Sequence, residues 1–275
     1  MGHIRTPVES PPAVAISENA GSVRAVSSSL RAVTGLGKTP VRVGATPVPH
    51  AEILNHVRDI LAERDFDLQI EIFETFDEPN DLLVDGRLDA NFFQYLPFLD
   101  DFNRRSRANL VPIVPVHIEP FGLYSTHIGD LDAIPNHAEI ALPADPVNVS
   151  RSLAMLADLG LIECPVDPET PASVLDIRSN PYGLVLKKVS SAQLARVRDD
   201  FDIVFLFGNQ AMGLGVDTGT ALYCDRGNPA YAEYLVTRPE RRESPEIRAL
   251  AAALQSPSTR DFIDAAYRGQ VVAAF

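Results

Sequence analysis

The sequence predicts an α/β protein with mixed, mainly parallel sheets that are flanked by helices. Residues 41–43 alternate between apolar and polar side chains and end at Gly44, which is typical of a strand followed by a turn. A helix is expected from about His50, and a second alternating strand over 68–73. The order strand, helix, strand implies a right-handed crossover between parallel strands. A chain of 275 residues is long enough for one large domain or for two lobes.

The later elements indicate that the chain leaves a first lobe and returns to it. Expected after the first crossover are strands over 110–116, 122–125, 139–143, 201–207 and 231–238, and helices over 246–255 and 258–269. We place the first crossing near residue 125, so that lobe 1 comprises 39–125 plus 226–275 and lobe 2 comprises 126–225. Residues 1–38 read as a flexible leader, rich in Ser, Pro, Gly and Ala. Two crossings predict a clamp with a ligand cleft between its lobes.

Composition excludes several classes of partner. The net charge is −13, with 37 acidic against 24 basic residues, which argues against nucleic acid and anionic membranes. Cys164 and Cys224 are too few for a metal site, although they are free to pair with each other. No run approaches the ~20 apolar residues that a membrane span needs. Residues 1–40 contain neither a signal peptide nor a cysteine for lipid attachment. We therefore expect an extracytoplasmic location, either periplasmic or as a membrane-anchored lipoprotein, if an export signal has been removed.

The stretch from Asp89 to Leu99 concentrates aromatic side chains in a protein with only 7% aromatic residues. The positions of Phe92, Leu96 and Leu99 have helical spacing, with Pro97 interrupting the helix, and plain burial in a core explains them equally well. Uncharged polar residues among the rings, Asn91 and Gln94, favour the wall of an apolar pocket.

Arg151 occupies an unusual place for a cation. Asn148 is a reasonable N-cap for a helix that runs to Gly160, which puts Arg151 in the first turn, where a positive charge opposes the helix dipole. A guanidinium beside free helix N–H groups can bind a carboxylate through two hydrogen bonds. The alternative is a surface arginine that pairs with a nearby aspartate.

No catalytic motif is present. The six histidines show no convincing ligand spacing, and the Gly-x-Ser-x-Gly elbow, the phosphate loop and zinc-type cysteine patterns are missing. The sequence therefore predicts a binding protein without a metal or cofactor, and not an enzyme.

Four motifs carry a resemblance that spans about residues 40 to 275. Residues 43–54 resemble V-G-x-T-P-x-P-H-A-E-I-L, and residues 89–99 resemble D-A-N-x-F-Q-H-x-P-Y-L. Residues 145–153 and the strand over 231–238 resemble P-N-D-P-x-N-x-x-R-x-L and Y-x-N-x-x-V-x-R. These motifs are those of the NlpA lipoprotein family, whose MetQ-like members are methionine-binding substrate-binding proteins of ABC importers. The resemblance implies a two-lobed, periplasmic-binding-protein-like (type II) fold and an ABC permease as partner.

The resemblance also implies a pocket. Transferred by position, it comprises Phe76, Phe93, Tyr95, Phe98, Arg151, Asn209 and Glu233. In the family the first four are usually Tyr, Phe, His and Tyr, and the arginine holds the carboxylate of the bound amino acid. Phe207 and Glu233 stand where the family usually has asparagine. The side chains at the polar end of the pocket thus differ from those usual in the family, while the apolar wall is retained.

Three functions remain open at this point. The first is an importer's solute-binding protein for methionine, for another small carboxylate or for a more apolar ligand. The second is an intracellular enzyme or sensor built on the same two-lobed fold, since fold alone does not fix function. The third is a protein that no longer binds a ligand and acts through a partner surface.

Overall fold

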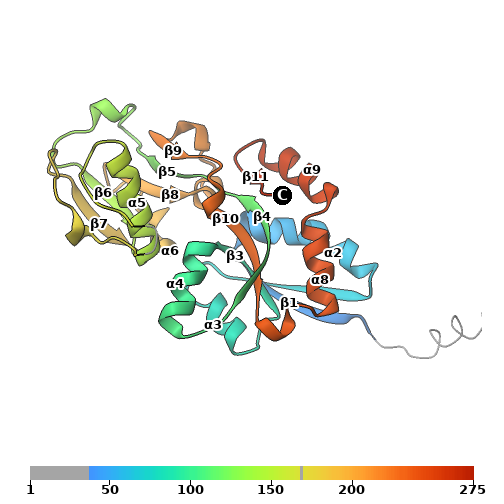
Figure 1. Cartoon of the computed structure of the whole chain (residues 1–275). Coiled ribbons are helices and arrows are strands. Elements are labelled where there is room, and N and C mark those ends of the chain that lie inside the picture. The colour runs from blue at the N-terminus through green and yellow to red at the C-terminus, as the bar shows by residue number, and fades with distance from the viewer. Residues whose placement is uncertain (1–36, 168–169) are drawn as a thin grey trace, which may run out of the picture. The chain divides into compact units, whose positions relative to one another are not determined.

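The structure is a computed structural model that describes residues 37–167 and 170–275. Lys38–Phe275 form one unit, which contains two separate sheets (Figure 1). We call the part built on the first sheet lobe 1 and the part built on the second sheet lobe 2. The leader expected over 1–38 lies almost entirely outside the described residues.

Lobe 1 is built on a mixed sheet with the strand order β11-β4-β10-β3-β1-β2. Strands β2, β1 and β3 are parallel, whereas β10 is antiparallel to both β3 and β4, and β11 is antiparallel to β4. Its strands are β1 (Thr39–Ala45), β2 (Phe66–Ile72), β3 (Ala90–Tyr95), β4 (Val111–Ile118), β10 (Ala232–Thr237) and β11 (Val272–Ala273).

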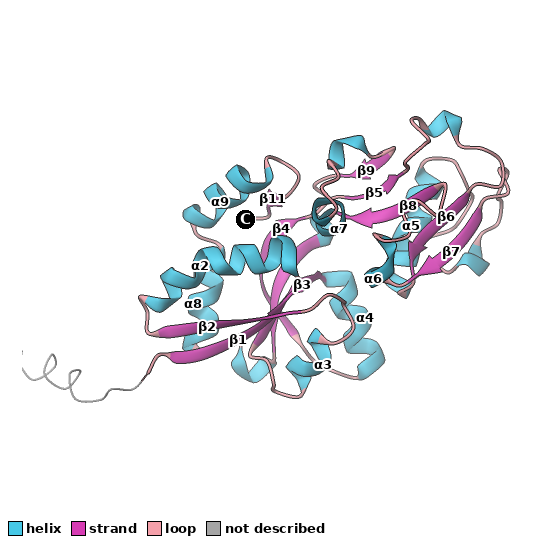
Figure 2. Ribbon diagram, turned by 180° about the vertical axis from the view of Figure 1, so that it is seen from behind, coloured by secondary structure: helices cyan, strands magenta, loops and turns pink. Residues whose placement is uncertain are grey.

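Helices cover this first sheet, as Figure 2 shows. They are α2 (Glu52–Ala62), α3 (Pro79–Val84), α4 (Leu96–Ser106), α8 (Pro245–Leu254) and α9 (Pro257–Tyr267), and a short turn, η2 (Pro47–Ala51), precedes α2. The apolar residues of α2 recur every three or four positions, and Ile53, Leu54, Val57 and Leu61 are buried. They pack with β1 and α8 into one hydrophobic core.

Lobe 2 has its own mixed sheet and its own core. The strand order is β7-β6-β8-β5-β9, in which β7, β6 and β8 are parallel and β5 is antiparallel to β8 and β9. Its elements are β5 (Phe121–Tyr124), β6 (Glu139–Pro143), α5 (Pro146–Asp158), β7 (Val185–Val189), α6 (Ser191–Leu194), β8 (Ile203–Phe207), α7 (Gly208–Gly213) and β9 (Tyr223–Asp225). Every residue of β8 is buried, as expected for a continuous apolar strand.

The chain passes between the sheets earlier than the sequence suggested. We expected the crossing near residue 125, but β5 already pairs with β8 and β9 in the second sheet. Only Glu119 and Pro120 separate β4 from β5. The boundary was misplaced because β4 and β5 are both apolar strands, and apolar alternation does not reveal to which sheet a strand belongs.

The aromatic stretch is a strand followed by a helix and not one interrupted helix. Residues 90–95 form β3, which is buried along its whole length between β1 and β10. Pro97 lies in the first turn of α4, where its missing N–H costs no hydrogen bond, so it begins a helix and does not break one. Leu99 remains a core residue of lobe 1.

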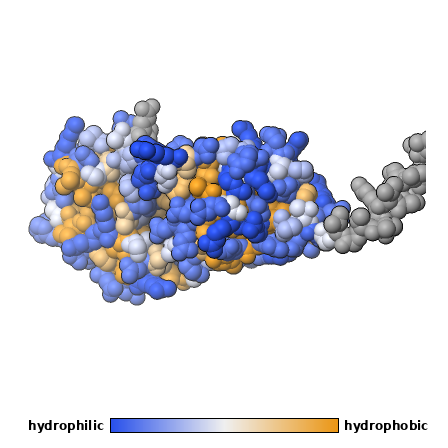
Figure 3. Space-filling model, turned by 90° about the horizontal axis from the view of Figure 1, so that it is seen from below, coloured by the Kyte–Doolittle hydropathy of each residue, from blue (hydrophilic) through white to orange (hydrophobic). Residues whose placement is uncertain are grey.

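Other sequence-based expectations concern the cysteines and the surface. Cys164 and Cys224 are both free thiols, so they do not pair. Within residues 37–167 and 170–275, none of the helices combines the length and apolar character that crossing a membrane requires. Figure 3 shows one face on which hydrophilic residues predominate, with apolar patches between them.

Candidate functional site

A small cavity lies where the two lobes meet. Its volume, counted as space open to the centre of a water molecule, is about 20 Å³, which is room for one or two waters. Lobe 1 contributes His50, Phe76, Phe93, Gln94, Tyr95, Phe98 and Glu233, lobe 2 contributes Asn148, Phe207 and Asn209, and Glu119 comes from the connection between them. A wider surface cleft of about 450 Å³ adjoins it at Phe76 and Asn209. A second, of about 390 Å³, opens beside Arg151 and Tyr231.

Aromatic rings form one wall of the cavity. The ring centre of Phe76 lies 6.2 Å from that of Phe93, 6.3 Å from that of Phe98 and 5.6 Å from that of Phe207. These separations are typical of aromatic pairs in protein cores. Phe207 ends β8 in lobe 2, so the wall is completed only where the lobes meet.

Tyr95 links the two lobes directly. Its hydroxyl donates a hydrogen bond to the side-chain oxygen of Asn148, the third residue of α5. Asn148 was expected to cap α5, but Asp145 does so, because its carboxylate accepts a hydrogen bond of 2.9 Å from the backbone N–H of Asn148. The side chain of Asn148 lines the cavity, and its Nδ2 donates to the Asp145 carboxylate at 3.1 Å. Burial raises the pKa of Tyr95 well above its usual value, so this hydroxyl stays a donor.

Arg151 is both buried and paired. Its side chain is only 5% exposed, and Nη2 lies 3.2 Å from Oδ2 of Asp225 on β9. The guanidinium carbon lies 3.6 Å from the ring centre of Tyr231 and 4.6 Å from that of Phe121, which are cation–π distances. The sequence left open a ligand-facing arginine or one paired with an aspartate, and the structure combines an aspartate partner with a position beside the cleft. Nε of Arg151 has no hydrogen-bond partner among the described residues.

Two glutamates lie close together in the interior. Glu119 and Glu233 are each 7% exposed. Nε2 of His50 lies 3.6 Å from Oε1 of Glu119 and 3.7 Å from Oε2 of Glu233. Burial raises the pKa of Glu233 well above its usual value, and the nearby Glu119 raises it further, while Arg151 opposes the shift. Burial also raises the pKa of Glu119, opposed by His50, by the N–H of Asn209 and by Arg151.

A glycine allows lobe 2 to reach Glu119. The backbone N–H of Asn209 donates a hydrogen bond of 2.8 Å to Oε2 of Glu119. A Cβ atom on Gly208 would lie 2.7 Å from a ring carbon of Pro120 and 3.2 Å from Cβ of Glu119. Any other residue at 208 would therefore push α7 away from the connection between the lobes.

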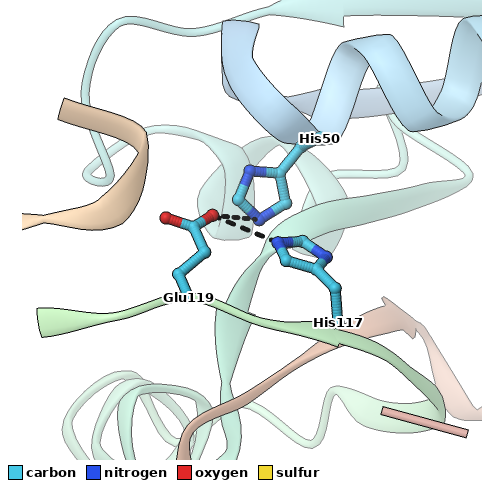
Figure 4. A group of neighbouring side chains, drawn as sticks. All are labelled: His50, His117 and Glu119. Atoms are coloured by element: carbon cyan, nitrogen blue, oxygen red, sulfur yellow. Dashed lines mark hydrogen bonds and ion pairs between the residues drawn. The ribbon is translucent and has the colours of Figure 1, made fainter. Parts of the chain in front are cut away.

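His50, His117 and Glu119 form a compact group, shown in Figure 4. Their nearest nitrogen and oxygen atoms lie within 4.8 Å of one another, which is close enough to consider a metal ion. Metal-bound histidines usually donate their second ring N–H to a partner, as Nδ1 of His50 can to Thr46 at 2.7 Å. Nδ1 of His117 has no such partner among the described residues. We therefore assign the group as a hydrogen-bonded network, in which Nε2 of His117 donates to Glu119 across 3.1 Å.

Asn91 and Gln94 serve the fold more than the cavity. Nε2 of Gln94 donates to Oδ1 of Asn80 across 2.6 Å, and Oε1 of Gln94 accepts from Nδ2 of Asn80 across 3.0 Å. Nδ2 of Asn91 donates to the same Asn80 oxygen at 2.8 Å. These amides fasten α3 to β3, and Gln94 also lines the cavity, as expected, whereas Asn91 does not.

Comparison with known proteins identifies the family to which this chain belongs. A family model described as NlpA lipoprotein matches residues 41–275. The chain belongs to the NlpA lipoprotein family. A methionine-binding lipoprotein MetQ from Bacillus subtilis is 33% identical to this NlpA-family chain over 243 residues, covering 86% of the chain and 88% of the relative.

Solved structures of similar proteins have the same fold. The structure of a nutrient-binding protein from Burkholderia cenocepacia bound to methionine matches this NlpA-family chain with a TM-score of 0.82 and 30% identity, over 86% of the chain and 100% of that protein. A periplasmic substrate-binding protein of an ABC transporter from Coxiella burnetii matches with a TM-score of 0.80 and 30% identity, over 85% and 100%. The two-lobed substrate-binding-protein fold expected from the sequence is thus confirmed.

The structure brings most of the expected pocket residues of this NlpA-family chain to one cavity. They are Phe76, Phe93, Tyr95, Phe98, Asn209 and Glu233, whereas Arg151 lies beside it, against Tyr95. Sequence reasoning missed His50, His117 and Glu119 as members of the site. A signal was available, because two ionisable residues at 117 and 119 occupy the end of an otherwise apolar strand, immediately before the chain changes sheets.

Proposed function

We propose that this protein is the solute-binding component of an ABC importer, and that it binds methionine or a related small amino acid between its lobes. The observation that carries the proposal is the aromatic cavity at the junction of the lobes, in a chain that is similar over nearly its full length to a methionine-bound protein. Substrate-binding proteins hold their ligands in such clefts and close by hinge motion.

The aromatic wall suits the side chain of such a ligand. Phe76, Phe93, Phe98 and Phe207 offer ring faces and edges but no hydrogen-bonding group. A thioether is polarisable and makes favourable contacts with aromatic rings. Since the cavity is only about 20 Å³ in this closed arrangement, a methionine side chain requires the lobes to part or the rings to turn.

Arg151 suits the carboxylate of the ligand. Its Nε is buried and lacks a hydrogen-bond partner among the described residues, while Nη2 contacts Asp225. Tyr231 and Phe121 hold the guanidinium plane in place, which limits the rotamer freedom that binding must otherwise remove. A ligand carboxylate that reaches Arg151 competes with Asp225 for it.

The relatives also support a cellular setting. Similar proteins are named as lipoproteins and as a periplasmic substrate-binding protein of an ABC transporter. We propose an extracytoplasmic location, on the side of the membrane from which an importer collects its solute, with an ABC permease as the protein partner. Release of the ligand to the permease then follows reopening of the cleft.

The experiment is a ligand screen read by thermal melting, followed by isothermal titration calorimetry with the compounds that stabilise the protein. The panel contains the natural amino acids and small carboxylates. Loss of a charge-assisted contact in Arg151→Ala should weaken binding by about tenfold to a hundredfold. Arg242→Ala is the control, since that side chain is 61% exposed and its only ion pair among the described residues is with Glu243.

Two results would count against the proposal. If no amino acid or small carboxylate raises the melting temperature, the ligand class is wrong. If Arg151→Ala binds as tightly as the wild type, the arginine does not hold the carboxylate.

A further inference from the structure

Two buried carboxylates face one part of the cavity without a cation. No lysine or arginine nitrogen of the described residues lies within 4.0 Å of the Glu119 or Glu233 carboxylate, and the nearby bases are His50 and His117. Oε2 of Glu233 makes no hydrogen bond within the described chain, and neither does Nε2 of His50. Buried polar atoms are rarely left in this state, because each costs about 1–3 kcal/mol.

The surrounding groups do not neutralise the pair. Those that act on it from the neighbouring elements are His50 of η2, Tyr95 of β3, His117 of β4, Arg151 of α5 and Tyr267 of α9. Burial lowers the pKa of His50 to about 4 and lowers that of His117, so both imidazoles are neutral at pH 7. Arg151, the one cation of this set, already contacts Asp225.

The negative charge of the two carboxylates can be balanced in two ways. Two neighbouring carboxylates cannot both ionise in a desolvated site unless a positive charge joins them. In the ligand-free protein the charge is a proton on one carboxyl group. In the liganded protein it is a cation that the ligand brings.

We propose that Glu119 and Glu233 together bind the ammonium group of the ligand, and that Glu233 is the residue that makes a primary amine obligatory. The inference rests on the proposed function only for the identity of the rest of the ligand, the part to which the ammonium group is attached. The cavity that the pair lines has room for one or two waters and therefore for an ammonium group, which offers three N–H donors to atoms such as the unpartnered Oε2 of Glu233 and Nε2 of His50. As the ammonium arrives, the proton held by the pair passes to the solvent.

The subsite can be tested apart from the rest of the ligand. Methylammonium chloride at high concentration should raise the melting temperature of the wild-type protein above that in sodium chloride of the same ionic strength. Glu233→Gln, which keeps the size of the side chain, should abolish the difference. Glu246→Gln is the matched control, since Glu246 is another buried glutamate, but it lies on α8 and contacts Arg241.

Methionine tests the same subsite within the whole cleft. L-methionine should bind the wild type, whereas N-acetyl-L-methionine, which has no ammonium, should not. Loss of one charge-assisted contact predicts that Glu233→Gln binds methionine about tenfold or more weakly. Calorimetry in two buffers with different ionisation enthalpies should show that methionine binding releases protons, because the pair gives up a proton that it held. This wild-type measurement does not depend on a variant that folds.

The outcomes separate the two proposals. Stabilisation by methylammonium that Glu233→Gln removes supports the subsite, even if methionine fails to bind and the proposed function falls. Methionine binding that is equally tight in Glu233→Gln and releases no proton overturns the subsite and leaves the proposed function standing. A protein that ignores methylammonium but loses stability when a chelator is added holds a metal ion there, which also overturns the inference.

Discussion

The hydroxyl of Tyr95 donates a hydrogen bond to the side-chain oxygen of Asn148, and this bond joins β3 of lobe 1 to α5 of lobe 2. Both residues are buried, and Asn148 is in turn held by Asp145. One of the contacts between the lobes is therefore made by two residues that also line the cavity.

Tyr95→Phe removes this bond and leaves the ring in place. We expect ligand affinity to fall by about threefold to tenfold, because a neutral hydrogen bond contributes about 0.5–1.5 kcal/mol. Calorimetry measures the affinity, and small-angle scattering without ligand should show a larger radius of gyration than in the wild type. Tyr182→Phe serves as the control, since Tyr182 is 39% exposed. Equal affinities and equal radii in wild type and Tyr95→Phe would show that the bond does not hold the lobes together.

Phe207→Ala should enlarge the cavity. Phe207 contacts Phe76 of lobe 1 and Phe121 of lobe 2, with ring centres at 5.6 and 4.8 Å. Removing a buried phenylalanine costs about 3 kcal/mol of unfolding free energy, which urea denaturation measures. The variant should also accept ligands with bulkier side chains in the melting screen.

Phe205→Ala is the matched comparison for that experiment. Phe205 is fully buried in the core of lobe 2 and does not line the cavity. It should lose a similar amount of stability without any change in ligand preference. A changed preference in Phe205→Ala would mean that general loosening of lobe 2, and not the volume beside Phe76, alters selectivity.

Glu233→Gln should stabilise the ligand-free protein at neutral and alkaline pH. The pKa of Glu233 in the folded protein is raised well above its ordinary value of 4.5. The folded protein therefore holds a proton that the unfolded chain has lost, and its stability falls as the pH rises from about 4.5 through the raised pKa. The variant should lack this decline, so the two stability curves should converge toward pH 4.5. Parallel curves from urea denaturation across this range would contradict the expectation.

His50→Gln should alter the acidic side of the same profile. Burial lowers the pKa of His50 from 6.5 to about 4. Below about pH 6.5 the imidazole of residue 50 binds a proton in the unfolded chain, whereas in the folded protein it binds one only near pH 4. The free energy of unfolding of the wild type therefore falls as the pH drops through this window, by about 3 kcal/mol in total. His50→Gln should reduce the fall. If the free energy of unfolding of His50→Gln falls as much between pH 6.5 and pH 4 as that of the wild type, the imidazole is already charged in the folded protein.

The sequence predicted much of the fold because local patterns were strong. Alternation identified β1 and β2, and the apolar run over 201–207 identified β8. The spacing of Phe92, Leu96 and Leu99 misled, because a buried strand followed at once by a helix places apolar residues at intervals that a helix would also give. Only the pairing of β3 with β1 and β10 distinguishes the two, and pairing is not a local property.

The site was harder to predict than the fold. The aromatic residues were found through family motifs, but the pairing of Glu119 with Glu233 joins residues 114 positions apart. Each residue is distinctive in its own segment, Glu119 next to an apolar strand and Glu233 in place of the family's usual asparagine, but neither feature points to the other residue. Their proximity depends on β10 inserting between β3 and β4, a placement that hydrophobic periodicity alone does not reveal.

Only Glu119 and Pro120 connect β4 to β5, so a residue that touches the cavity is also part of the short link about which one lobe would turn. A ligand that contacts that carboxylate would therefore touch the link itself. Binding could then change the angle between the lobes directly, without any relay of intervening side chains.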